Sequence, residues 1–255
     1  MSYELKFTPY TRIMMTFAEE IEQSPEAFLR QEVIDGYVTQ LAGVEIRRDN
    51  ALKAFVVSDL ILAFMLAGND FRIPYLDKAA SEIPVILEAL TMFSSFSLMI
   101  LCHTLFIHTA YGLCLGILSG KSIKSDNTDS DLIKASKTYF DFAVKAFSRD
   151  FHPSGKDFFK PGIGYIFAAR AMSAAITIVL IFIPILHAYL IWSSFKVTFA
   201  EFNGSIAYFL YFSVTTLMNI IGILLVALPS MSFRFTVNGD AKRVMESRNT
   251  HSRQG

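Results

Sequence analysis

Residues 163–193, with the sequence IGYIFAARAMSAAITIVLIFIPILHAYLIWS, decide the fold class of this 255-residue chain. Arg170 is the single Lys, Arg, Asp or Glu in the stretch, and a helix needs about 20 apolar residues to cross the hydrocarbon of a bilayer. Three further apolar blocks occupy residues 51–68, 89–118 and 205–233. Buried helices of soluble proteins rarely continue so long without charges. The sequence therefore predicts an all-α polytopic integral membrane protein with four transmembrane helices, and it excludes a soluble globular protein.

The apolar blocks divide the chain into five regions. These are a cytoplasmic amphipathic helical region (1–50), a first transmembrane hairpin (51–120), a cytoplasmic loop with an amphipathic helix (121–162), a second transmembrane hairpin (163–233) and a disordered cytoplasmic tail (234–255). Lys and Arg concentrate in the first, third and fifth regions. Because basic flanks are retained in the cytoplasm, both termini are predicted to be cytoplasmic.

The first block is the exception among the four, because it has only 18 residues and contains Lys53 and Asp59. If it lay in the membrane interface, the chain would have three spans and its amino terminus would be outside. Arg47 and Arg48 form a basic flank at its start, which favours a full span.

The first fifty residues predict two amphipathic helices, 9–22 and 25–48, each begun by Ser or Thr followed by Pro. One apolar face of the second helix consists of Leu29, Val33, Tyr37 and Leu41. Residues 1–50 contain nine acidic and five basic side chains, so an anionic inner leaflet would repel this region. The apolar face is therefore predicted to dock a cytoplasmic partner protein or a neighbouring protomer.

The loop between the second and third spans has the opposite charge pattern. Its predicted helix, 130–151, has an aromatic apolar face opposite a basic face formed by Lys134, Lys137, Lys145 and Arg149. This pattern is typical of a helix that lies on the surface of membrane lipids. The alternative is a helix that packs on the amino-terminal helices of the same chain.

Two stripes of small residues predict close packing of the second and third spans, within one protomer or between protomers. They consist of Gly112, Gly116 and Gly120, and of Ala168, Ala171 and Ala175. Small residues let helix backbones approach in lipid, where burial of apolar surface supplies no driving force between helices.

Three polar residues lie at the centres of their blocks and form a predicted intramembrane cluster: Asp59, His103 and Asn219. A carboxylate at the bilayer centre costs about 2.5–3.5 kcal/mol, so Asp59 should face the bundle and have a partner. The cluster is interpreted either as a proton or cation site or as hydrogen bonds that fix helix register. His187 falls about 13 Å outside the midplane of its block and is not assigned to the cluster.

The sequence contains no signature of an enzyme, a bound cofactor or a metal site. Gly-x-Ser-x-Gly, His-Glu-x-x-His and Cys-x-x-Cys are absent, and the histidines lie at different depths. Cys102 and Cys114 both lie inside the second block, so they provide no extracytoplasmic disulfide. Lys plus Arg and Asp plus Glu balance at 23 each, which argues against direct binding of nucleic acid.

These features favour a homo-oligomeric membrane scaffold or sensor subunit that docks a cytoplasmic partner. An oligomeric ion channel or membrane-permeabilising effector is the alternative, with Thr104, His108 and Tyr111 as possible pore lining. A small transporter is third, because four spans without an internal repeat leave little room for alternating access unless protomers combine. Signals for targeting and for disulfides are missing, so the expected location is a bacterial inner membrane.

Overall fold

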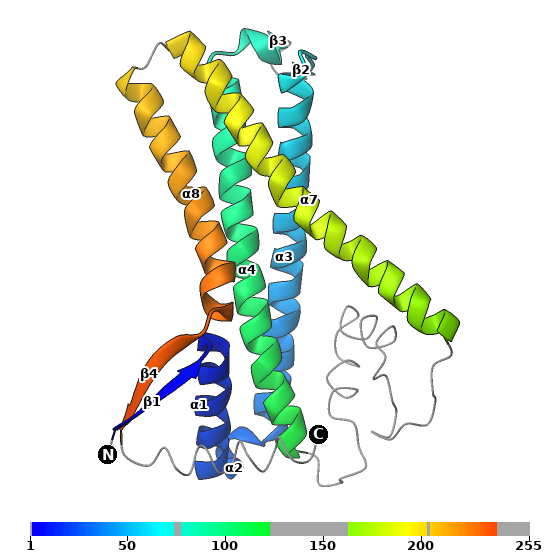
Figure 1. The fold of residues 1–255 in the computed structure, drawn as a ribbon, viewed down its shortest axis with the longest axis vertical. Coiled ribbons are helices and arrows are strands. Elements are labelled where there is room, and N and C mark those ends of the chain that lie inside the picture. Colours follow the sequence, from blue (N-terminus) through cyan, green and yellow to red (C-terminus); the bar gives the residue numbers. More distant parts are fainter. Residues whose placement is uncertain (1, 74–77, 123–162, 203–204, 239–255) are drawn as a thin grey trace. The chain divides into compact units, whose positions relative to one another are not determined.

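The computed structural model describes residues 2–73, 78–122, 163–202 and 205–238 (Figure 1). Contacts divide the chain into two compact units, each of which is described by itself. The first unit comprises residues 1–44, 106–160 and 226–255, and the second comprises residues 45–105 and 161–225. The predicted helix 130–151 and its four basic residues lie outside the described residues.

The elements, in chain order, are β1 (Ser2–Phe7), α1 (Pro9–Gln23), α2 (Pro25–Phe28), α3 (Gln31–Leu66), β2 (Arg72–Ile73), β3 (Lys78–Ala79), η1 (Ala80–Glu82), α4 (Ile86–Ser122), α7 (Ile163–Phe202), α8 (Ile206–Ser230) and β4 (Phe233–Asn238). Most of the residues that the structure describes lie in helices. This confirms the prediction of a helical chain.

Three of the described helices are long and apolar enough to cross a membrane: Ile86–Lys121, Ile166–Glu201 and Ile206–Ser230. This finding supports the prediction of a membrane protein with transmembrane helices. The first apolar block is not among the three, and its Lys53 and Asp59 lower its hydropathy. It forms the carboxyl-terminal part of α3, which is one continuous helix from Gln31 to Leu66. The fourth span and the orientation of the termini stay predictions.

In the first unit, the cap and proline pattern at residue 8 produces the helix expected from it. The Thr8 side chain accepts a hydrogen bond from the Thr11 amide at 3.1 Å, and Pro9 occupies the first helical position. The predicted helix 25–48 is divided instead. α2 ends after one turn. α3 then begins, and the Arg30 carbonyl accepts a hydrogen bond from the Val33 amide at 3.0 Å.

The first unit also contains a two-stranded antiparallel sheet that corrects the prediction of a disordered tail from residue 234. β1 pairs with β4 from Ser2↔Asn238 to Phe7↔Phe233, and the two strands lie side by side in Figure 1. The rings of Phe7 and Phe235 stack with centroids 4.4 Å apart, and Arg12 lies over the Phe235 ring at 5.6 Å. Pairing between opposite ends of the chain leaves no local sequence signal, which explains why it was not predicted.

The second unit is built from the end of α3, the first half of α4, α7 and most of α8. One buried apolar cluster joins Leu62 of α3 to Leu190 of α7 and Tyr211 of α8, and another joins Phe55 of α3 to Leu101 of α4. Buried hydroxyl side chains lie in the same unit: Ser58, Thr91, Ser94, Ser95, Ser194, Thr198 and Thr215. Several apolar side chains of α7 and α8 are more than half exposed: Ile178, Phe182, Ile185, Leu217 and Ile223. Buried hydroxyl groups together with exposed apolar side chains fit helices that are surrounded by lipid.

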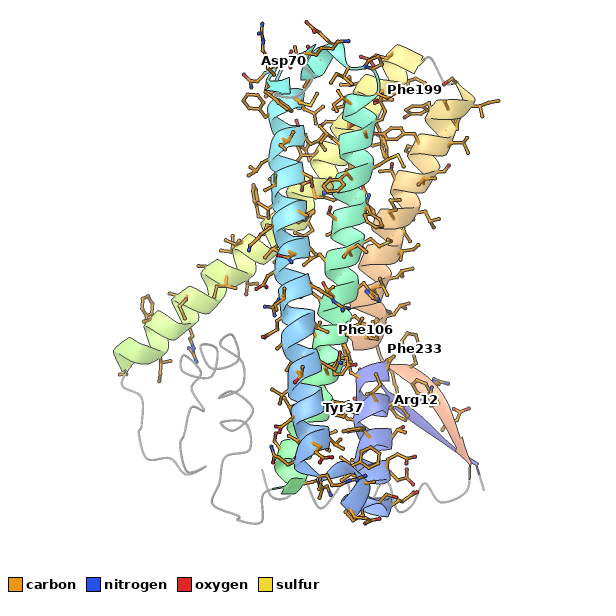
Figure 2. The ribbon with its side chains drawn as sticks, turned by 180° about the vertical axis from the view of Figure 1, so that it is seen from behind. Arg12, Tyr37, Asp70, Phe106, Phe199 and Phe233 are labelled. Atoms are coloured by element: carbon orange, nitrogen blue, oxygen red, sulfur yellow. The ribbon has the colours of Figure 1, made fainter. Side chains whose placement is uncertain are left out.

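A short hydrogen-bonded clasp lies between α3 and α4, where Figure 2 shows Asp70. Asp70 Oδ1 accepts from the Phe71 amide at 2.8 Å and from the Ser81 amide at 3.2 Å, and the Ser81 hydroxyl donates to Oδ2. The two-residue strands β2 and β3 pair antiparallel beside it. These bonds lower the pKa of Asp70 below its ordinary value of 3.8, and the largest cause is the Ser81 side chain.

Candidate functional site

A buried carboxylate and a buried imidazole meet in the interior of the second unit. His187 on α7 has its Nδ1 atom 3.0 Å from both side-chain oxygens of Asp59 on α3. His187 is 3% exposed and Asp59 is 8% exposed. Burial makes an unpaired charge costly, so each of these side chains provides the partner that the other needs.

Asn219 on α8 continues the network on the other side of the imidazole ring. Its Oδ1 atom lies 2.9 Å from His187 Nε2, and its Nδ2 atom donates to Ser95 Oγ and to the Thr215 carbonyl, both at 2.9 Å. A backbone carbonyl can only accept, which assigns Nδ2 to this side of the amide. The Asn219 oxygen therefore faces Nε2, and Nε2 has to carry a proton.

The Asp59 side of the ring then determines how many protons the network holds. If Asp59 is ionised it can only accept, so His187 Nδ1 also carries a proton and the ring is an imidazolium. If Asp59 carries the proton instead, it donates to Nδ1 of a neutral ring. Both arrangements contain one shared proton and have no net charge. Without that proton, a ring lone pair would face an oxygen of either Asp59 or Asn219, and one hydrogen bond would be replaced by a repulsive contact.

Neighbouring groups hold the network in place. Ser94 of α4 donates to Asp59 Oδ1 and lies 3.4 Å from His187 Nδ1, and Ser58 donates to the Phe55 carbonyl at 2.9 Å. The Phe55 ring packs on the imidazole with centroids 5.1 Å apart. All four helices of the second unit thus contribute to one hydrogen-bonded site.

The structure brings together two of the three residues of the predicted cluster. Asp59 and Asn219 both bind His187, whereas His103 is exposed on α4. The apolar block 163–193 places His187 near its outer end, whereas α7 continues to Phe202. Measured from the middle of the candidate span Ile166–Glu201, His187 is only about 5 Å from the centre. The polar spacing of His187, Ser194 and Thr198 in an apolar helix is a signal that could have identified it.

The other predicted site residues are placed as follows. Thr104 is buried and donates to the Leu101 carbonyl at 2.9 Å, while His108 and Tyr111 are half-buried. Gly112 is buried, Gly116 is half-buried and Gly120 is exposed, and Ala168, Ala171 and Ala175 are exposed. The glycines belong to the first unit and the alanines to the second.

A different glycine makes the close helix approach that the second unit contains. A Cβ atom on Gly222 of α8 would lie 3.4 Å from the Met99 Cα atom and 3.7 Å from Cys102 Sγ on α4. A Cβ atom on Gly120, by contrast, would meet no other atom within 4 Å.

The predicted docking face is largely covered by the chain itself. Leu41 is fully buried, and Leu29, Val33 and Tyr37 are half-buried. The Tyr37 ring, visible on α3 in Figure 2, packs against Phe17 at 5.6 Å and Tyr111 at 5.9 Å between centroids. The first unit instead exposes acidic side chains: Glu19, Glu20, Glu22, Glu26, Glu32 and Asp35.

Comparison of the chain with protein-family models, with curated proteins and with solved structures gives no match.

Proposed function

We propose that this protein is a proton-responsive sensor and scaffold subunit of a membrane complex. The observation that carries the proposal is the network of the buried Asp59 and His187 with the half-buried Asn219, whose hydrogen bonds are complete only when the Asp59–His187 pair holds one proton. Histidine is the side chain whose charge changes most readily near neutral pH. Ionisable residues inside membrane helices are commonly functional for this reason.

Loss of the shared proton would weaken the contacts among four helices at once. The network joins Asp59 of α3 and His187 of α7 to Asn219 of α8, and Ser94 and Ser95 attach it to α4. Removing one partner of a buried ion pair typically destabilises a protein by about 3–5 kcal/mol, because a charge is left uncompensated. Helix packing in the second unit is therefore the property that proton release would change.

The contact between Asp59 and His187 also supports four spans. His187 lies within the candidate span Ile166–Glu201 and Asn219 within Ile206–Ser230, so the bonded part of α3 lies beside membrane-spanning helices. With α3 as a fourth span, both termini are on one side of the membrane. The basic residues of the predicted cytoplasmic regions assign that side to the cytoplasm, and we propose a bacterial inner membrane as the location.

The acidic surface of the first unit supports docking of a cytoplasmic partner with a basic surface. Opposite charges increase the rate of encounter and disfavour wrong partners. We propose that the subunit is a homo-oligomer and that each protomer presents this surface. Replacing Glu19, Glu20 and Glu26 together by Lys should abolish co-purification of the partner and leave the oligomer unchanged. Partner recovery equal to wild type would contradict docking at this surface.

The pH dependence of thermal stability tests the proton-binding role of the pair. For the purified full-length protein in detergent, the proposal requires the free energy of unfolding to fall as the pH rises from about 6 to about 9, because a pair that keeps its shared proton only in the native state makes stability depend on pH. The double variant Asp59→Asn, His187→Gln should lose this slope. His103→Gln, an exposed histidine on α4, is the matched control and should keep it. A double variant with the wild-type slope would overturn the proposal.

An oligomeric ion channel is the second candidate, and the buried hydroxyls of α4 favour it. Thr91, Ser94, Ser95, Ser97 and Thr104 are all buried in a helix long and apolar enough to cross a membrane. Polar side chains in such helices mark ion pathways as well as structural contacts. Ion flux through the purified protein in liposomes, abolished by Asp59→Asn in an intact oligomer, would place the channel first.

A further inference from the structure

A second group of buried oxygen atoms lies in the same unit and is not part of the Asp59–His187 network. Thr91 of α4 and Ser194 of α7 have their hydroxyl oxygens 2.6 Å apart, and Ser194 Oγ is 3.2 Å from the Tyr211 hydroxyl of α8. Glu88 precedes Thr91 by three residues on α4, and Thr198 follows Ser194 by four residues on α7, so each lies one helical turn from this contact on the same face of its helix. Three helices therefore bring one carboxylate and four hydroxyls within about one helical turn of the Thr91–Ser194 contact.

Two of these oxygens have no hydrogen-bond partner among the residues that the structure describes. They are Glu88 Oε1 and Thr198 Oγ1, in side chains that are 9% and 1% exposed. A buried polar atom without a partner typically costs about 1–3 kcal/mol, and more if it is charged. Two such atoms, each one helical turn from the Thr91–Ser194 contact, are expected where a bound group supplies the missing interaction.

The charge at this place favours a cation. Glu88 is in the first turn of α4, where the partial positive charge of the helix terminus stabilises a carboxylate. No ion pair compensates Glu88 within the described ranges. A buried carboxylate of this kind attracts a compact positive charge.

We propose that Glu88, Thr198 and Tyr211, together with Thr91 and Ser194, bind a hard monovalent cation such as Na⁺. All the donors are oxygens, whereas zinc and copper prefer nitrogen or sulfur. One carboxylate balances one positive charge, while Ca²⁺ usually takes six to eight oxygens that include several carboxylates. Hydroxyl oxygens retain a lone pair for a cation even while they share a proton with a neighbour.

The cation site is distinct from the proton site and does not depend on it. Asp59, His187 and Asn219 contribute no atom to the cation site, and Glu88 and Thr198 contribute none to the proton network. The two sites share α4, α7 and α8. Their responses to Na⁺ and to pH can therefore be separated by substitution.

Thermal unfolding of the purified full-length protein in detergent, in NaCl against choline chloride at equal ionic strength, tests the proposal. Binding to the native state raises the Tm with the logarithm of the Na⁺ concentration above the Kd, and choline is too large to replace Na⁺. Glu88→Gln should weaken Na⁺ binding by at least about tenfold, because it removes the charge. Glu82→Gln, an exposed acid before α4, is the matched control and should behave as wild type.

Thr198→Val supplies an independent test that keeps the shape of the side chain. If Thr198 Oγ1 binds the cation, this variant loses much of the Na⁺ response. If it is only an unpartnered buried hydroxyl, the variant is as stable as wild type or more so and keeps the response. Equal Tm values in NaCl and choline chloride, or a Na⁺ response that persists in both Glu88→Gln and Thr198→Val, would overturn the proposal. Asp59→Asn should leave the Na⁺ response intact, which separates this result from the pH test.

Discussion

His187 Nδ1 lies 3.0 Å from both carboxylate oxygens of Asp59, although the two residues are 128 positions apart in the chain. The pair is buried in an interior that also contains Asn219 and several serine and threonine hydroxyls. This contact joins α3 to α7 in the second unit.

Asp59 and His187 should be strongly coupled in a double-mutant cycle. Asp59→Ala or His187→Ala alone is expected to destabilise the protein by about 3–5 kcal/mol, because each leaves a buried polar partner unpaired. The double variant should lose less free energy of unfolding than the two single variants lose in sum. The difference, which is the interaction energy of the pair, should be about 0.5–3 kcal/mol. Chemical unfolding in detergent measures the free energy of unfolding of the wild type, the two single variants and the double variant. Additive losses would show that the two side chains act independently.

The Asp70 clasp should open in acid. Hydrogen bonds from Ser81 and Phe71 hold the pKa of Asp70 below 3.8, so its contribution is present above the pKa of the unfolded chain and disappears as the pH falls through the lower folded value. Hydrogen exchange of the Ser81 amide, corrected for its intrinsic rate, should therefore accelerate below about pH 4. In Asp70→Asn the exchange should be fast already near pH 6. Protection that is unaffected by acid would contradict the clasp.

Gly222 should tolerate little added volume. A Cβ atom there already meets the Met99 backbone at 3.4 Å, so Gly222→Leu has to separate α8 from α4 and should cost about 1–3 kcal/mol. Gly120→Ala is the control, because its Cβ meets nothing within 4 Å and alanine favours the helix by up to about 1 kcal/mol. The Tm should therefore fall for Gly222→Leu and rise for Gly120→Ala. A stability of Gly222→Leu equal to that of wild type would show that the helices do not approach closely at this position.

Thiol labelling should distinguish four spans from three. In a variant in which Cys102 and Cys114 are replaced by Ala, an impermeant reagent should label Asn69→Cys on intact cells and should reach Glu20→Cys only after permeabilisation. Both positions are exposed, and they lie before and after the part of α3 that contacts His187. If α3 does not cross the membrane, the two positions will react from the same side.

Some elements follow from local sequence patterns and are found in the structure. Thr8 and Pro9 begin α1 as their cap chemistry predicts, and the long apolar runs form the helices that are long enough to cross a membrane. The ends of the helices are less predictable. α7 continues nine residues beyond residue 193, because no proline or glycine stops it and the aromatic residues at the end of the block are compatible with a helix.

The sequence by itself determined the class of this protein, because runs of about 20 apolar residues are a local property that depends on no distant contact. It also identified Asp59 and Asn219 as polar residues that need partners inside the membrane. Only the tertiary structure decided that His187 rather than His103 is that partner, because the choice depends on how α7 is rotated and placed against α3 and α8. The same reason applies to the pairing of β1 with β4 and to the contacts of Ser194 with Thr91 and Tyr211, since each joins residues whose separation in the chain carries no information about their distance in space.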